Sequence, residues 1–305
     1  MSNNAYSIWV LEYSYVEDYA ASGIVYGAHN QGTRKLPYCY VVIKGHGRTI
    51  MIDVGYNSKD YGAYLEQKFG VLNWHSPAVV LPQCGVTPEE VDTVILTHAH
   101  FDHLGNTDAF PNATFYIQEK ELAKWVWVMS LPPRQQHWMM VATDPSDVLR
   151  AVTLAKDGRL RCIDGPMADF LPGIDLHVAY DSHTYASMWV HVRNDLAPQS
   201  QDSWVLAGDL VYSYDNFLSG SDVVDGQLRG ELAITPVGLA VGSQNNLVMA
   251  TEEMLKSVDY EPKRLIPIHE ERLKDVFPSR ITSQGLRLTE ICLGQNQLSK
   301  VTNNA

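Results

Sequence analysis

The chain has 305 residues, of which 45% are hydrophobic and 19% charged, as expected for a folded protein with a large core. Acidic residues outnumber lysine and arginine by 35 to 23, and the net charge of −12 argues against a nucleic-acid partner. No apolar run approaches the about 20 residues that cross a bilayer, and residues 1–4 do not resemble the start of a secretory signal. We therefore expect a cytoplasmic protein with no membrane partner. The cysteines are far apart, which favours free thiols over disulfides: Cys39, Cys84, Cys162 and Cys292.

The first part of the chain predicts mostly β-structure. Two β-rich runs flank the glycine-containing turn 45–47, which is typical of a hairpin. Residues 61–69 predict a helix that ends at Gly70, and Thr87-Pro88-Glu89-Glu90 has the capping threonine, proline and acids of a helix start. Strands are expected at 6–13, 38–44, 48–53, 93–96 and 113–117.

The second part alternates strands with helices. Helices are expected at 118–127 and 245–257, and strands at 174–180, 188–193, 203–207 and 264–268, the last of these being the final strand. No repeat and no linker divides the chain. We therefore expect a single domain over residues 1–305, of the α/β class, with two β-sheets and helices outside them.

The stretch 125–161 differs from its surroundings. It is rich in tryptophan and methionine and is interrupted by Pro132-Pro133, so we expect regular secondary structure to break at the prolines. Such an insertion could line a substrate pocket, form a subunit contact or simply cover one side of the core. The sequence leaves these three interpretations open.

The run Thr97-His98-Ala99-His100-Phe101-Asp102-His103 places four potential metal ligands within six residues, directly after an apolar segment. Neutral imidazole and carboxylate both suit zinc. His98 and His100 are two residues apart, so in an extended segment they point to the same side and can share one metal. Asp102 and His103 follow after the chain turns and are expected to face a second position.

Three further candidate ligands each follow an apolar strand: His183, Asp209 and His269. Because each lies just past a strand, all three could converge with the cluster at one edge of the sheets. Asp53-Val54-Gly55 ends another strand with an acid and a glycine.

This ordered set resembles the ligand pattern of the metallo-β-lactamase superfamily, and Asp53-x-Gly55 looks like an early segment of that family. The resemblance implies an αβ/βα sandwich of two mixed β-sheets with helices on the outer faces. It also implies two divalent ions, with Zn²⁺ first and Mn²⁺, Fe²⁺ or Co²⁺ as other candidates, and a bridging hydroxide as nucleophile. By that resemblance the first ion is held by His98, His100 and His183, the second by Asp102, His103 and His269, and Asp209 bridges both.

Tyr212, three residues after Asp209, resembles the tyrosine of acyl-homoserine lactonases and pyridoxolactonase-type enzymes. The expected catalytic residues are therefore Asp102, Asp209 and Tyr212, with the phenol contacting the substrate carbonyl or leaving oxygen. A packed aromatic remains the alternative for Tyr212. The segment 182–187 departs from the lactonases, since it lacks their Pro-Gly turn and second histidine. The Trp-rich segment fits an aromatic or bulky ring on the small-molecule substrate.

The leading hypothesis is therefore ring-opening hydrolysis of a lactone or related cyclic substrate. The alternatives are a glyoxalase-II-like thioesterase or other activated-carbon hydrolase, a mononuclear iron persulfide dioxygenase, and a non-catalytic binding module. A homodimer is the base-rate expectation for the quaternary state. His29 lies in a glycine-flanked loop that could approach the site, and the remaining histidines predict surface or core polar groups: His46, His75, His137, His177 and His191.

Overall fold

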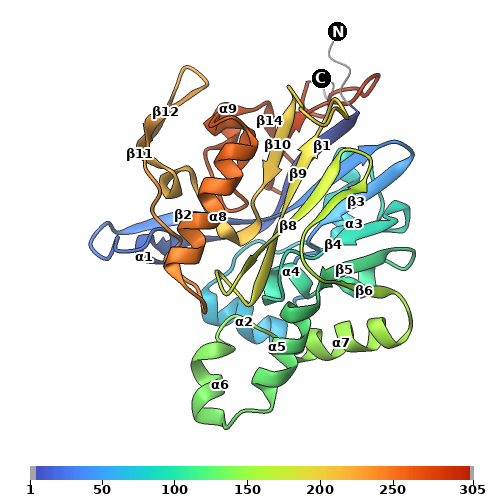
Figure 1. Ribbon diagram of the computed structural model, residues 1–305, viewed down its shortest axis with the longest axis vertical. Coiled ribbons are helices and arrows are strands. Elements are labelled where there is room, and N and C mark those ends of the chain that lie inside the picture. The colour runs from blue at the N-terminus through green and yellow to red at the C-terminus, as the bar shows by residue number, and fades with distance from the viewer. Residues whose placement is uncertain (1–4, 303–305) are drawn as a thin grey trace.

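The computed structural model describes residues 5–302, in which two β-sheets are flanked by helices (Figure 1). The larger sheet has the strand order β14-β15-β1-β2-β3-β4-β5-β6, and its β3–β6 half is parallel. Its strands are β1 (Tyr6–Ala20), β2 (Thr33–Gly45), β3 (Arg48–Ile52), β4 (Thr93–Ile95), β5 (Thr114–Gln118), β6 (Leu160–Ile163), β14 (Ser279–Ile281) and β15 (Arg287–Cys292).

The smaller sheet has the order β13-β10-β9-β8-β7, and only its β10–β13 pair is parallel. Its strands are β7 (Met167–Leu171), β8 (Ile174–Tyr180), β9 (Ala186–Arg193), β10 (Ser203–Leu206) and β13 (Leu265–Ile266). A separate hairpin, β11 (Leu218–Val224) with β12 (Gln227–Leu232), projects from the body at the upper left of Figure 1.

Helices cover the outer faces of the two sheets. α8 packs on β8 and β10, whereas α5 packs on β5 and α7 on β6. The helices are α1 (Ala21–Ile24), α2 (Asp60–Phe69), α3 (Pro77–Val80), α4 (Phe101–Leu104), α5 (Glu119–Met129), α6 (Pro133–Met139), α7 (Pro145–Lys156), α8 (Gln244–Ser257) and α9 (Leu273–Val276). The mixed sheets and outer helices confirm the predicted αβ/βα fold class.

Local sequence chemistry explains several element boundaries. The β2–β3 hairpin turns through His46 and Gly47, whose φ angles of 51° and 71° match the primed turns that suit strand twist. Gly70 ends α2 in the left-handed conformation, as predicted. β4 is buried along its whole length, as expected for a parallel strand covered on both faces.

One expectation about secondary structure is confirmed and one is wrong. Regular structure breaks at the prolines as expected, since α5 ends at Met129 and α6 begins at Pro133. Most of 125–161 is nevertheless helical, because Pro133 and Pro145 occupy the first turns of α6 and α7, where a missing N–H costs nothing. The strand near residues 264–268 is not the last one, since β14 and β15 follow and β15 pairs with β1. Within residues 5–302, none of the helices has the length and hydrophobicity to cross a membrane.

Candidate metal centre

The seven predicted ligands converge at one edge of the two sheets, where all of them are buried. They come from four separate segments of the chain. His98 and His100 follow β4, Asp102 and His103 lie in α4, His183 is in the β8–β9 turn, Asp209 is in a short 3-10 turn after β10, and His269 follows β13. The smaller sheet and the larger sheet therefore each contribute part of the site.

The first ligand group consists of three histidines and Asp209. His100 Nδ1 lies 3.0 Å from His98 Nε2 and 3.0 Å from His183 Nε2. Three imidazole nitrogens this close together, with a carboxylate oxygen beside them, form the four-ligand set that tetrahedral zinc prefers.

The second ligand group consists of Asp102, His103, His269 and Asp209. His103 Nε2 lies 3.4 Å from Asp102 Oδ2, and His269 Nε2 lies 4.0 Å from the same oxygen. Two imidazoles and two carboxylates give this group more negative charge than the first, and the same number of ligand atoms.

Asp209 joins the two groups. Its Oδ2 lies 3.7 Å from His98 Nε2 and 3.3 Å from His183 Nε2, in the first group. Its Oδ1 lies 3.0 Å from His103 Nε2 and 3.1 Å from His269 Nε2, in the second. One carboxylate oxygen therefore faces each group, which is the geometry of a bridging ligand.

Outer contacts orient the histidine rings. His183 Nδ1 lies 2.9 Å from the Leu239 carbonyl and His269 Nδ1 lies 2.7 Å from the Pro37 carbonyl, so both Nδ1 atoms carry the proton. The Nε2 lone pair of each ring is then free to bind a metal.

Asp53 orients the ring of His103 directly and the ring of His98 through Thr97. Its Oδ2 lies 2.7 Å from His103 Nδ1 and accepts the Thr97 hydroxyl at 2.8 Å. The Thr97 oxygen can then accept a hydrogen bond from the Nδ1–H of His98 at 3.0 Å. The sequence contained a signal for this residue, an acid at a strand end before Val54-Gly55, but did not indicate its partner.

The electrostatics of the two groups differ. Burial and the neighbouring histidines hold the pKa of His98 well below its ordinary value, and burial with His183 lowers the pKa of His100 to about 3. Burial would also lower the pKa of His103, but Asp209 and the other acids around it raise that pKa well above the ordinary value. His98 and His100 of the first group are thus neutral imidazoles, whereas the acids of the second group favour positive charge on His103.

The donor chemistry therefore fits two divalent ions. The neutral imidazoles of His98 and His100 are in the state that binds metal. In the second group, burial raises the pKa of Asp209, but His103, His269 and His98 outweigh it and keep the carboxyl ionised. A dication supplies the positive charge that these carboxylates would otherwise draw from protonated histidines.

Tyr212 lies beside both ligand groups. Its ring centroid is 4.7 Å from that of His269 and 5.8 Å from that of His183, and the side chain is buried. Burial, followed by the negative charge of Asp209, raises the pKa of Tyr212 well above its ordinary value. The phenol therefore keeps its proton and can act as a hydrogen-bond donor.

The Trp-rich stretch approaches the centre through one residue. Trp125 is buried, with its ring centroid 5.9 Å from His100 and 5.1 Å from Tyr185. Trp127 and Trp138 are instead 45% and 59% exposed. The aromatic wall next to the first ligand group is therefore made by Trp125 and Tyr185.

A third histidine–aspartate group lies away from this centre, on β8 and β9: Asp175, His177 and His191. Arg193 donates to both oxygens of Asp175, from Nε at 2.8 Å and from Nη2 at 3.1 Å. A guanidinium on the same carboxylate disfavours a second cation there. We interpret this group as part of the packing of the smaller sheet.

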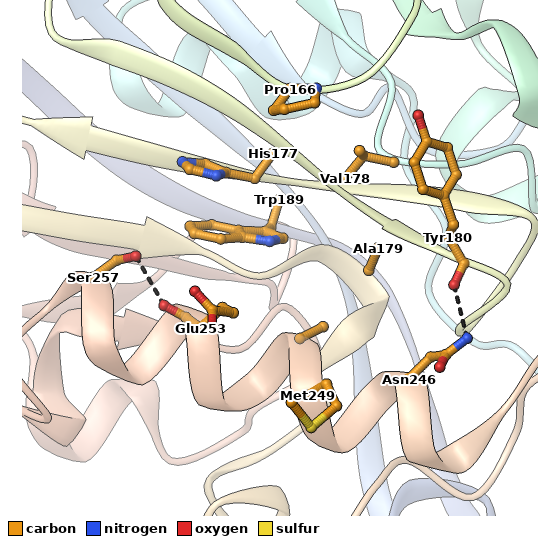
Figure 2. A pocket seen from close by; sticks show the side chains of 11 residues that line it. Pro166, His177, Val178, Ala179, Tyr180, Trp189, Asn246, Met249, Glu253 and Ser257 are labelled. Atoms are coloured by element: carbon orange, nitrogen blue, oxygen red, sulfur yellow. Dashed lines mark hydrogen bonds between the residues drawn. The ribbon is translucent and has the colours of Figure 1, made fainter.

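A cavity of about 510 Å³ opens between this sheet and α8. Figure 2 shows His177 lying flat on Trp189, with Met249 and Glu253 of α8 opposite them. The ring centroids of His177 and Trp189 are 3.9 Å apart, and the two rings are nearly parallel. None of the seven metal ligands lines this cavity.

Parts of the sequence are similar to known proteins. Residues 32–172 match the model of the metallo-beta-lactamase superfamily. A 41-residue stretch is 46% identical to a protein of Methanocaldococcus jannaschii described as a probable metallo-hydrolase. That match covers 13% of this chain and 20% of the relative, so the chain spans about one fifth of the curated relative that it matches.

Solved structures extend the comparison to nearly the whole chain. A quorum-quenching N-acyl homoserine lactone lactonase is 15% identical and superposes with a TM-score of 0.61, covering 90% of this chain and 96% of its own. A dizinc quorum-quenching lactonase is 14% identical, with a TM-score of 0.57 and coverage of 98% and 97%. At these identities the likeness shows the fold.

The family match confirms the predicted resemblance, and structural neighbours described as metal-dependent hydrolases agree with the predicted enzyme class. The matched residues include the cluster at 98–103, and the shared fold extends over the segments that supply the other ligands. Residues 32–172 of this chain thus match the metallo-beta-lactamase superfamily, in the part of the chain that holds the cluster at 98–103.

Proposed function

We propose that this protein is a dinuclear metal-dependent hydrolase that opens a lactone or a related cyclic ester. The observation that carries the proposal is the Asp209 carboxylate, which turns one oxygen to each of two four-ligand groups. Zinc is the first candidate for both ions, because the ligands are imidazoles and carboxylates in sets of four.

When bound, a pair of divalent ions lowers the pKa of water and polarises a carbonyl group. The chain's own residues keep the reactants in place around that chemistry. Asp209 and Asp102 remain ionised, Asp209 because the surrounding histidines outweigh its burial. Tyr212 keeps the proton on its hydroxyl and donates a hydrogen bond to the oxygen that gains charge as the ring opens.

A cyclic ester is supported by two features. Structural neighbours of the same fold are described as N-acyl homoserine lactone lactonases. The Tyr212 ring lies beside one histidine of each ligand group, His183 and His269. The aromatic pair Trp125 and Tyr185 next to His100 favours a substrate with an aromatic or bulky group.

Turnover assays on the zinc-loaded protein test this proposal. The panel contains aromatic and aliphatic lactones, acyl-homoserine lactones, thioesters and β-lactams, and we expect the highest kcat/KM on a lactone. Preferential thioester turnover would replace the lactonase with a thioesterase on the same ligands. About one iron and no zinc per chain in the protein as isolated, with oxygen consumed, would contradict hydrolysis altogether.

A further inference from the structure

Glu121 lies in the first turn of α5 and is fully buried. Its Oε1 accepts the backbone N–H of Ala99 at 3.0 Å and the indole N–H of Trp125 at 2.7 Å. Its Oε2 accepts the hydroxyl of Thr184 at 2.9 Å and the backbone N–H of Ala186 at 2.7 Å. Four donors thus serve one carboxylate, two on each oxygen.

These donors belong to the two segments that supply the histidines of the first ligand group. Ala99 lies between His98 and His100, and Thr184 directly follows His183. The segments are more than 80 residues apart in the chain, and Glu121 joins them with charge-assisted hydrogen bonds in a buried setting.

The second ligand group is held by other contacts. His103 is oriented by Asp53, and His269 by the Pro37 carbonyl. Asp53 also reaches His98 through Thr97, but none of the four hydrogen bonds of Glu121 involves a ligand of the second group.

We propose that Glu121 is a positioning residue for the first metal ion: it sets the spacing between the His98–His100 segment and the His183 turn. The inference rests on the proposed dinuclear function. It implies that the affinities of the two positions can be changed separately, with Glu121 controlling only the one bound by three histidines.

Glutamine at position 121 has nearly the same shape but replaces one acceptor oxygen by an NH₂ donor. The Thr184 hydroxyl can rotate and also contacts Ser187 Oγ at 2.7 Å, so the amide NH₂ is best accommodated on that side. The N–H of Ala186 then loses its acceptor. Glu121→Gln should therefore loosen the His183 turn.

The experiment measures zinc at each position in the full-length wild-type and Glu121→Gln proteins. Competition with a chromophoric chelator gives the two dissociation constants, and anomalous scattering from crystals grown at limiting zinc gives the occupancy of each position. We expect the first position to bind about 10- to 100-fold more weakly, with the second changed by less than about twofold. Cobalt-loaded protein should lose the visible absorption of the three-histidine position first.

Asp175→Asn is the matched control, because it also removes a buried, hydrogen-bonded carboxylate but touches none of the metal ligands. It should lower the unfolding midpoint and leave both zinc affinities unchanged. If Glu121→Gln does not fold, Trp125→Phe removes one of the four donors and should weaken the same position to a smaller degree.

Equal weakening of both positions, or no weakening at all, would overturn the role of Glu121. A wild-type protein with one ion, at the first position, would contradict the dinuclear function while leaving the Glu121 comparison valid. A first position that stays empty in saturated wild-type protein would overturn both.

Discussion

At the scale of single residues, the centre depends on how one carboxylate is shared. Asp209 contacts four histidines through its two oxygens, and these histidines come from three different parts of the chain. A residue with this position contributes to both ligand groups at once. Replacing Asp209 removes a ligand atom from both groups, whereas replacing a single histidine removes one from only one group.

Asp209→Ala should lose both ions as well as activity. Removing the carboxylate takes one ligand from each group and leaves the Nε2 atoms of His103 and His269 without their nearest carboxylate oxygen. Elemental analysis after dialysis should find well under two zinc ions per chain, and His269→Ala should retain the first ion in the same measurement. Full metal content in Asp209→Ala would show that Asp209 does not bridge.

Tyr212→Phe should separate metal binding from turnover. The hydroxyl is not among the ligand atoms, so two ions should remain bound, whereas loss of the hydrogen bond to the developing oxyanion should lower kcat by about tenfold or more. Steady-state kinetics with metal analysis on the same sample provide the test. An unchanged kcat would make Tyr212 a packed aromatic.

At the scale of elements, the turn that carries His183 is held by the segment that leads into α8. Val241 N–H donates to the His183 carbonyl at 2.9 Å, and Gly242 N–H donates to the Ser182 carbonyl at 3.0 Å. His183 Nδ1 meets the Leu239 carbonyl from the same segment. Backbone pairing between two loops therefore fixes the direction of one metal ligand.

Gly242→Ala tests this pairing. A Cβ atom on Gly242 would lie 2.3 Å from the Ser182 carbonyl oxygen and 2.4 Å from Asp181, both backbone positions, so the two loops must separate. We expect a loss of about 1–3 kcal/mol in unfolding free energy and a weaker first metal ion. Urea unfolding and zinc titration measure the two effects.

Gly158→Ala is the control for that experiment. It adds a methyl group at the end of α7, where nothing lies within 4 Å, at a positive φ of 74° that makes the substitution strained. It should reduce stability without changing zinc affinity. If Gly242→Ala behaves in the same way, the loop pairing does not orient His183.

At the scale of the whole molecule, the stability of the sandwich should depend on pH through the smaller sheet. Burial, opposed in part by Asp175, lowers the pKa of His191 to about 4, and burial also lowers the pKa of His177. Both imidazoles are therefore neutral in the folded state and become protonated on unfolding at mildly acidic pH.

The pKa of His191 is lower in the folded state than its unfolded value near 6.5, so protonation of His191 favours unfolding. Stability from His191 is fully present above pH 6.5 and is lost as the pH falls towards 4, by up to about 2 kcal/mol between pH 7 and pH 5. Urea unfolding with a chelator present at both pH values should show this loss, and His191→Gln should reduce it. Equal pH dependence in both proteins would rule out this origin.

Much of the fold was accessible from local patterns. The hairpin of β2 and β3, the end of α2 at Gly70 and the strand β8 all follow from residue types within a few positions of each other. The helices α6 and α7 were not predicted, because the sequence alone does not distinguish a proline that ends one helix from a proline that begins the next. The pairing of β15 with β1 joins the two ends of the chain, and no local pattern indicates it.

The sequence by itself determined the candidate metal ligands: their residue types, their order along the chain and their placement after apolar strands. Only the tertiary structure decided how the ligands are held, through Glu121, Asp53 and the carbonyls of Pro37 and Leu239. The physical reason is that residue type and spacing act locally. The partner of a buried carboxylate or a ring nitrogen depends instead on which distant segments the packing of two sheets brings together.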